Sequence, residues 1–455
     1  MIVYYMDRII PGIIVLAVQG ILLAILRKCM KKKWKKPWFL KSQVGVLLIM
    51  LLAIVFGYFG KYVSIANAPT KQYTVQELKE DLKQLEKVLF GQSPMYYTDQ
   101  EVLREAFDQV KKQITEPMTE EAYYRLINPL VVQVRCGHTN LSISQALQKS
   151  REGKNIFFPI AVSLQEDCIM VKESNTEYGV EEGNIIQSIN GVEAGEIIET
   201  IVDNISRDGD NEAVAQYIAN ACFQIKYYDF VEQSHTYDVV LEKKDGTIVT
   251  KQVEAIWNKE WNTNAWDLHK EMYADGDYYS STFEKDSATL RIRVFFEEKT
   301  KFKTFLKEFF REVEERGITK VILDVRGNFG GDAKMAKELL SYLITEPYSY
   351  FESKLPLTMK LLGYGKTVKP KQTSLKYETE LWIDGGCFST CGHFAAVYKS
   401  LDLGKVMGEP TGGGSTCTDG SSDVVLHNTG IRLHYATTVF SVRADLEKEN
   451  MVCPN

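Results

Sequence analysis

Apolar residues recur at helical spacing from Thr74 onward, where leucine or valine appears every three or four positions up to Leu89. Two further amphipathic segments follow at 101–114 and 119–134. Residues that commonly cap helices precede these two segments, namely Asp99 and Thr119. The pattern predicts a small helical bundle that ends near residues 134–140.

Residues 155–256 show the alternation typical of β-strands. One strand enters a tight turn at Asn190-Gly191, a helical stretch follows at 196–205, and two later strands flank Asp245-Gly246. With a helix inserted near 211–224, this order resembles a PDZ domain. A PDZ domain captures peptide ends by strand addition, so we expect the strand edge beside 183–191 to accept a peptide. An ordinary small β module is the alternative.

Strands and helices alternate from Ser287 onward. The expected strands are 289–294, 321–325, 380–384 and 405–408. The expected helices are 301–316, 333–343 and a third one that begins after Ser389. Because βαβ order brings parallel strands together under helices, we predict an α/β fold with a mainly parallel sheet. Stretches with a β pattern at 423–426 and 431–440 close the chain.

Two apolar runs at residues 9–26 and 44–60 each approach the length that crosses a bilayer. Residues 27–41 between them hold eight cations and no acid. Since such loops stay in the cytoplasm, we predict a two-pass cell-membrane protein with an extracytoplasmic body. A signal peptide followed by a buried helix is the alternative.

Charge is divided unevenly along the chain. Residues 1–60 carry +8 and the whole chain carries −6, so residues 61–455 carry about −14 by subtraction. This acidic body argues against nucleic acid as a partner. Seven of the eight cysteines lie in the body, an odd number that leaves at least one thiol free if the others pair.

A strand-to-helix turn carries the most reactive candidate residue. An apolar strand ends at Asp384, Gly385-Gly386 breaks it, and a helical pattern begins after Ser389. A serine here projects from the first helical turn, where free amides, beginning with that of Thr390, face any negative charge formed beside it. These are the parts of a serine nucleophile and half an oxyanion hole. A serine that only caps the helix is the alternative.

A glycine-rich loop follows the strand at 321–325 and reads Arg326-Gly327-Asn328-Phe329-Gly330-Gly331-Asp332. It lacks the Gly-Lys-Ser/Thr ending of a phosphate-binding loop. Together with the serine turn about 60 residues later, it resembles the C-terminal processing peptidase and tricorn family of serine peptidases. The resemblance spans residues 74–455 and implies a helical bundle, a PDZ-like unit and a crotonase-like α/β catalytic domain.

The resemblance also implies roles for individual residues. The tricorn branch places its histidine base in a Gly-His-Thr setting ahead of the PDZ-like unit, which Gly137-His138-Thr139 matches. Ser389 is then the expected nucleophile and His138 the expected base. The amides of Gly330 and Thr390 are expected to bind the oxyanion, with Gly331 as the alternate donor.

A glutamate late in the domain orients the histidine in that branch, and Glu447 is our choice, with Asp445 and Glu449 as alternatives. Gly414 stands where the processing-peptidase branch has a lysine base, so a Ser–Lys dyad is not expected. Gly137 stands where the tricorn branch has a serine. This departure keeps open a catalytically silent peptide- or ligand-binding or sensor protein on the same fold.

Three rival chemistries involve residues near the same motifs. His393 lies one helical turn after Ser389 and could act as the base, although we expect a core residue there. A zinc site made from Cys136, His138, Cys387, Cys391 and His393 is the second rival, but its sequence gap is unlike that of compact zinc motifs. Cys391 could also replace Ser389 as the nucleophile. We expect no metal or other cofactor.

These observations divide the chain into five parts. The predicted parts are a transmembrane hairpin at 1–60, a linker at 61–72, a helical bundle at 73–150, a PDZ-like domain at 151–260 and a crotonase-like domain at 261–455. Together they predict a membrane-anchored serine endopeptidase that acts on peptides or proteins outside the cytoplasm. The oligomeric state is left open.

Overall fold

The computed structural model describes residues 71–151, 156–165, 168–257, 278–296, 299–352, 355–374, 376–446 and 450–455. They belong to one compact unit, Ala66–Asn455. The predicted transmembrane hairpin and almost all of the predicted linker lie outside the described residues. Within the described ranges, no helix combines the length and the apolar character that crossing a membrane requires.

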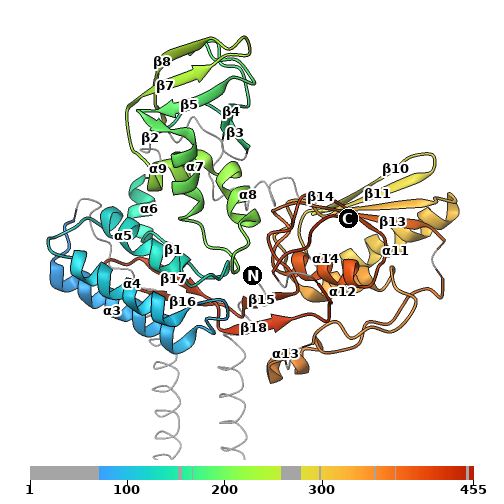
Figure 1. The fold of residues 1–455 in the computed structure, drawn as a ribbon. Coiled ribbons are helices and arrows are strands. Elements are labelled where there is room, and N and C mark those ends of the chain that lie inside the picture. Colours follow the sequence, from blue (N-terminus) through green and yellow to red (C-terminus); the bar gives the residue numbers. More distant parts are fainter. Residues whose placement is uncertain are drawn as a thin grey trace, which may run out of the picture. The chain divides into compact units, whose positions relative to one another are not determined.

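Three helices begin the described part of the chain (Figure 1). They are α3 (Val75–Gln92), α4 (Gln100–Gln113) and α5 (Glu120–Val132). Both predicted caps are present: the Asp99 side chain accepts from the Glu101 and Val102 amides, and the Thr119 hydroxyl accepts from the Ala122 amide. The apolar faces of the helices share one buried core, as the leucine spacing predicts.

A hairpin from the far end of the sequence completes this helical part. Strand β17 (Arg432–Tyr435) pairs with β16 (Ser422–Val425) and with β1 (Asn140–Ser142), and both pairings are antiparallel. The apolar residues of the hairpin are buried in the core of α3–α5. The buried carboxylate of Asp81 on α3 accepts four hydrogen bonds from Asn428 and Thr429. The predicted catalytic domain 261–455 therefore includes a hairpin that belongs to another part of the fold. This hairpin buries its apolar face against the helices α3–α5.

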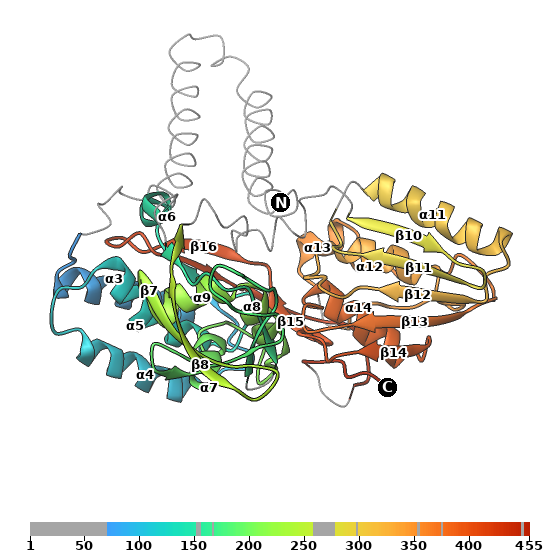
Figure 2. The same cartoon turned by 90° about the horizontal axis from the view of Figure 1, so that it is seen from above.

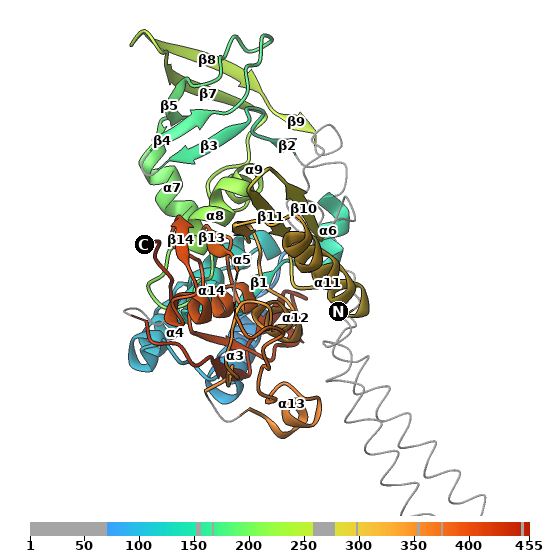
Figure 3. The ribbon, with the colours of Figure 1, turned by 90° about the vertical axis from the view of Figure 1, so that its right-hand side faces the viewer.

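Residues 156–257 form a β-rich unit where the PDZ-like unit is predicted, and we keep that name for it; α6 (Gln145–Arg151) precedes it. Its main sheet has the order β3-β4-β5-β7-β8, with β6 paired to β5, and the short strands β2 and β9 pair separately. The strands are β2 (Ile156–Phe157), β3 (Val162–Gln165), β4 (Cys168–Val171), β5 (Ile185–Ile189), β6 (Val192–Glu193), β7 (Thr236–Glu242), β8 (Ile248–Glu254) and β9 (Ile256–Trp257). Helices α7 (Ala194–Val202), α8 (Ala213–Ala221) and α9 (Phe223–Phe230) lie along the sheet and share its core (Figure 3).

The strand that enters the Asn190-Gly191 turn is not a sheet edge. This strand, β5, has β4 on one side and β7 on the other, so the predicted peptide-accepting edge at 183–191 is wrong. The hydrophobic pattern identifies a strand but not its neighbours. The edges of the main sheet are β3 and β8. On β3, the Leu164 amide already donates to Asn220 Oδ1 at the end of α8, at 2.9 Å.

The α/β part is built on five strands that lie side by side (Figure 2). Their order is β10 (Tyr279–Phe283), β11 (Ser287–Ile292), β12 (Lys320–Asp324), β13 (Glu378–Ile383) and β14 (Lys405–Gly408). Strands β11 to β14 are parallel and β10 is antiparallel, which confirms the predicted mainly parallel sheet. Helices α11 (Lys299–Glu315), α12 (Ala333–Leu340) and α14 (Thr390–Ser400) complete its core.

Two smaller features accompany this sheet. Helix α13 (Leu357–Leu361) lies in the long connection between α12 and β13. Strands β15 (Thr416–Asp419) and β18 (Thr438–Ser441) pair antiparallel and carry the chain out to the β16–β17 hairpin and back. This ribbon therefore links the α/β part to the helical part.

The loops that carry the two sequence motifs follow the carboxyl ends of β12 and β13. The glycine-rich loop follows β12, and the serine turn follows the neighbouring parallel strand β13. Two hydrogen bonds hold the loops together: the Gly327 amide donates to Asp384 Oδ1 at 2.7 Å, and the Phe388 amide donates to the Asn328 carbonyl at 3.1 Å. Parallel strand order thus brings both sequence motifs to one place.

Candidate active site

Ser389 occupies a strained turn between β13 and α14. Its backbone has φ 54° and ψ −125°, a conformation that side-chain-bearing residues seldom adopt and that marks functional sites. Although Ser389 is the N-cap residue of α14, its side chain makes no capping hydrogen bond. The hydroxyl is therefore directed to another partner, and a serine that only caps the helix does not describe this residue.

That partner is His138. Its Nε2 lies 3.0 Å from Ser389 Oγ, although the two residues are 251 positions apart in the sequence. His138 belongs to the short connection between α5 and β1, and its ring stacks on the Phe388 ring with centroids 4.7 Å apart. Both reacting groups are half-buried. A serine hydroxyl within hydrogen-bond reach of an imidazole is the basic arrangement of an activated nucleophile.

Gly137, which departs from the tricorn pattern, is required by packing. A Cβ at this position would lie 2.5 Å from the Phe388 ring, closer than real Cβ contacts come. The same ring supports the imidazole, so a serine at position 137 would disturb the base. The absence of that serine therefore does not by itself argue for a silent site.

The space beside the Ser389 hydroxyl is shaped by Gly330. A Cβ on Gly330 would lie 2.8 Å from the Thr390 amide nitrogen and 2.9 Å from Ser389 Cβ. The missing side chain thus leaves open the region in front of the Thr390 amide, where an oxyanion would form. Within the described part of the chain, the Thr390 and Gly331 amides donate no hydrogen bond.

The Gly330 amide itself is engaged. It donates to Asn328 Oδ1 at 2.8 Å, and Asn328 Nδ2 in turn donates to the Ile292 carbonyl at the end of β11. The predicted donor role of the Gly330 amide does not fit this arrangement, because its hydrogen is already used. The alternate donor, Gly331, fits better. The sequence motif predicts where the loop lies, but it does not predict which of its amides is left without a hydrogen-bond acceptor.

The structure leaves the predicted orienting residue open. Glu447 and its alternative Glu449 lie outside the described residues. Asp445 is exposed, and its amide donates to the Ser400 hydroxyl at the end of α14. Gly414 is buried in a glycine loop whose neighbour Gly413 donates to the Cys387 carbonyl at 3.0 Å.

His393 is a core residue in this structure. It is buried on α14, its Nε2 has no hydrogen-bond partner among the described residues, and burial lowers its pKa to about 4. The imidazole is therefore neutral at pH 7, as burial favours the uncharged form. The cysteines proposed as rivals are buried as free thiols, and the described residues contain no group of three side chains arranged to hold a metal ion.

One acidic residue next to His138 was not predicted from the sequence. Asp208, in the connection between α7 and α8 of the PDZ-like unit, is fully buried, and its Oδ1 accepts from the Gly137 amide at 2.7 Å. Nothing in the spacing of Arg207-Asp208-Gly209 marks such a residue, because the contact depends on how the PDZ-like unit packs. A buried position for an acidic residue is visible only in three dimensions.

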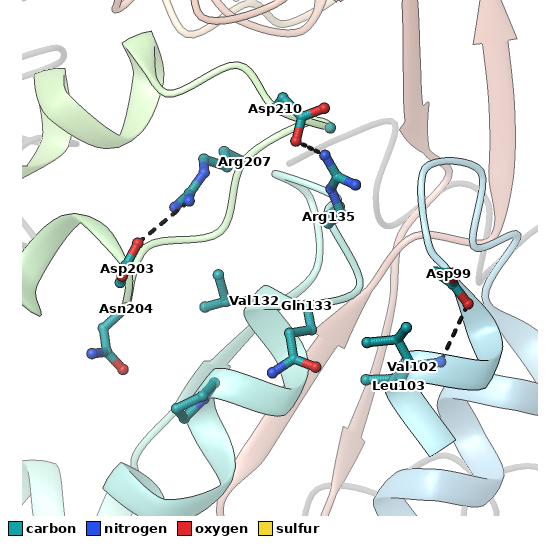
Figure 4. Close-up of a pocket in the computed structure, with 12 residues that line it drawn as sticks. Asp99, Val102, Leu103, Val132, Gln133, Arg135, Asp203, Asn204, Arg207 and Asp210 are labelled. Carbon is teal, nitrogen blue, oxygen red and sulfur yellow. Dashed lines mark hydrogen bonds and ion pairs between the residues drawn. The ribbon is translucent and has the colours of Figure 1, made fainter. Parts of the chain in front are cut away.

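A cavity of about 560 Å³ lies close to this connection (Figure 4). It is lined by parts of α4 and α5 and by residues 203–210, but neither His138 nor Ser389 lines it. Its two arginines are ion-paired, Arg135 with Asp210 and Arg207 with Asp203. Both arginines that line the cavity are therefore already paired with carboxylates.

Comparisons with known proteins show what the α/β part of the chain resembles. Residues 286–451 match the model of peptidase family S41. The part of the chain that carries Ser389 is a serine peptidase domain that resembles family S41. The match begins at the first parallel strand, β11, and includes both the glycine-rich loop and Ser389. His138 lies outside the matched residues, in the helical part of the chain. No curated relative matches the chain.

Solved structures extend the likeness beyond the S41 domain. A serine-to-alanine mutant of CPAF matches with a TM-score of 0.62 at 12% identity, over 84% of this chain and 92% of that one. Mature CPAF matches with a TM-score of 0.60 at 13% identity, over 84% and 92% of the two chains. At such identities the likeness shows a shared fold. The chain therefore shares the fold of CPAF through most of its length.

The open space at Gly330 leads to a prediction. A Gly330→Ala change should lower the rate of labelling by a fluorophosphonate probe by about 10²- to 10³-fold, because the new methyl group covers the Thr390 amide. Gly195→Ala is the matched control, since a Cβ there meets no atom within 4 Å. A Gly330→Ala protein labelled within threefold of the original rate would contradict the proposed location of the oxyanion.

Proposed function

We propose that the chain is a membrane-anchored endopeptidase that cleaves peptide bonds with Ser389 as nucleophile and His138 as general base. The observation that carries the proposal is the 3.0 Å contact between Ser389 Oγ and His138 Nε2. A neutral hydroxyl is a poor nucleophile at pH 7, and an adjacent imidazole removes its proton as it attacks.

In the acylation step, Ser389 Oγ bonds to the scissile carbonyl carbon and its proton passes to His138 Nε2. The carbonyl oxygen becomes an oxyanion, which the Thr390 and Gly331 amides are placed to stabilise. The tetrahedral intermediate then breaks its C–N bond, and His138 returns the proton to the departing amine. An acyl group remains on Ser389.

In the deacylation step, water replaces the amine as the reaction partner. His138 removes a proton from the water, hydroxide adds to the acyl carbon, and the C–O bond to Ser389 breaks while the proton returns to Oγ. The products are the free enzyme and a carboxylic acid, which releases its proton to water and becomes a carboxylate. Since a serine and a histidine carry each step, the proposal requires no metal or other cofactor.

The cellular placement rests on the amino-acid sequence. Residues 66–455 form a compact unit of their own, which suits a catalytic body tethered by a separate N-terminal segment. Because positively charged loops tend to stay in the cytoplasm, the eight cations between the two apolar runs favour a cytoplasmic loop and a peptidase on the other side of the membrane. Peptide or protein substrates outside the cytoplasm follow from this orientation.

The catalytic pair should behave as a unit. Ser389→Ala and His138→Ala should each lower the turnover of a fluorogenic peptide by at least about 10⁴-fold, and the double variant should be scarcely worse than either. His393→Leu is the control, because it changes a histidine on the helix of Ser389 that the mechanism does not use. We expect its activity to stay within about threefold.

Two outcomes would contradict this assignment. Near-normal turnover by His138→Ala combined with an inactive His393→Leu protein would move the base to helix α14. A folded wild-type chain that neither cleaves peptides nor reacts with a fluorophosphonate probe would instead indicate the silent binding protein.

The topology can be tested with thiol labelling in intact cells. In a chain with the partly exposed Cys168 and Cys453 changed to Ser, an impermeant maleimide should not reach Cys29. The same reagent should label a Lys71→Cys variant of this chain, because position 71 follows the second apolar run. Labelling of Cys29 from outside, before the cells are broken, would overturn the orientation.

A further inference from the structure

The two most exposed large apolar side chains of the described residues lie together on α13. Leu361 and Leu357 are 78% and 72% exposed, whereas the next most exposed, Ile248 on β8, is 64% exposed. The two leucines are four positions apart on one short helix, so their side chains share a face. A lone exposed leucine is ordinary, but two that share a face form a continuous apolar surface that a partner can cover.

The other face of α13 is already packed. Met359, together with Leu362 just after the helix, lies against a small cluster of buried side chains. The members of this cluster are Ala333, Leu355, Tyr364, Cys417 and Phe440. The segment is therefore apolar on two faces, and the fold covers only one of them. A helix that is apolar all round is normally buried on every side.

Helix α12 holds this segment in place. The buried Lys337 ammonium donates to the Tyr364 carbonyl at 2.6 Å and to the Lys366 carbonyl at 2.5 Å. The Lys334 ammonium lies 4.2 Å from the centroid of the Tyr364 ring. The exposed leucines are thus presented on a fixed support, and Figures 1 and 3 show α13 at the outside of the α/β part. A preorganised face loses little conformational entropy when a partner covers it.

Lysines accompany the apolar pair in an otherwise acidic body. Residues 353–377 contain six lysines and no acid, although residues 61–455 carry about −14. Lys360 and Lys366 are exposed and form no ion pair with a carboxylate of the described residues. A Cβ on Gly363 would lie 3.4 Å from Lys366 Cε, so this side chain runs beside the turn that ends α13. Leucines next to lysines match an anionic bilayer, which takes apolar side chains at its acyl boundary and ammonium groups at its phosphates.

The N-terminal part of the sequence brings such a bilayer within reach. The second apolar run ends at residue 60, and the described chain begins at residue 71. The segment between them spans at most about 40 Å even when it is fully extended. Because a tether raises the effective concentration of the lipid, a contact too small to form alone can form in the anchored chain. A second copy of the chain fits less well, since two leucines bury far less than the roughly 1,200 Å² of a stable protein interface.

We propose that the α13 surface, formed by Leu357, Lys360, Leu361 and Lys366, docks on the anionic lipid surface of the membrane that anchors the chain. The two leucines enter the boundary between headgroups and acyl chains, and the two ammonium groups meet lipid phosphates. This role rests on the membrane anchor of the proposed function. It gives the catalytic body a second point of attachment, which restrains its rotation about the tether.

The test uses the full chain reconstituted into vesicles, with a fluorescent dye on Leu361→Cys. Cys29, Cys168 and Cys453 are changed to Ser, since the other cysteines of the chain are buried. Ile248→Cys carries the same dye as the matched control from another exposed apolar position. In vesicles with about 30% phosphatidylglycerol, nitroxide-labelled lipids should quench the dye at position 361 at least about twofold more than the dye at position 248.

Substitutions separate the charged from the apolar contribution. Lys360→Gln combined with Lys366→Gln should remove at least about half of the quenching in anionic vesicles and none in phosphatidylcholine vesicles, and about 0.5 M salt should act in the same way. Leu357→Gln should lower the quenching in both kinds of vesicle. Lys307→Gln, which changes an exposed lysine on α11, is the charge control and should leave it unchanged. Since all these side chains are exposed, an unchanged Tm confirms that each variant is folded.

Three results would count against this surface or its anchor. Equal quenching at positions 361 and 248, in chains that stay in the vesicles through an alkaline wash, would overturn the proposal. So would a dye response at 361 that appears only when the protein-to-lipid ratio rises or when a peptide substrate is added, because the surface would then contact a second copy or the substrate. Loss of the whole chain in the wash would instead overturn the membrane anchor of the proposed function, and with it the tether.

Discussion

The hydrogen bond between Ser389 and His138 is the constraint on which the rest of this structure depends. It joins the first turn of a helix in the α/β part to a short connection in the helical part. Such a contact survives only if the two parts are held to a fraction of an ångström. The β15–β18 ribbon and the β16–β17 hairpin supply this link, since they leave the parallel sheet, enter the helical core and return. Removing either strand pair would loosen the base from the nucleophile.

The same place combines strain with unsatisfied polar atoms. Ser389 has a positive φ angle, His138 Nδ1 and Asp208 Oδ2 have no partner in the described residues, and the Thr390 amide faces open space. The strained turn and each buried polar atom without a partner destabilise the folded chain by roughly 1–3 kcal/mol. The large apolar core under the sheet tolerates this loss. The strain and the unpaired polar atoms therefore lie together around Ser389 and His138, as expected for a preorganised site.

Local sequence patterns were sufficient to predict most of the helices, strands and turns. The helix caps at Asp99 and Thr119, the parallel strands and the serine turn all depend on neighbouring residues, so they could be predicted from the chain. The pairing of His138 with Ser389 came from the family resemblance. What could not be predicted depends on contacts between distant segments. The burial of Asp208 against Gly137 and the attachment of the β16–β17 hairpin to α3 leave no trace in periodicity or spacing.

The most direct test of the account is to locate the covalent adduct of a fluorophosphonate by mass spectrometry of the digested protein. The account predicts one modified residue, Ser389, at near-complete occupancy in the original chain and at a small fraction of that occupancy in His138→Ala after the same exposure. Modification of Cys391 or of another serine would contradict it. So would equal modification of Ser389 with and without His138.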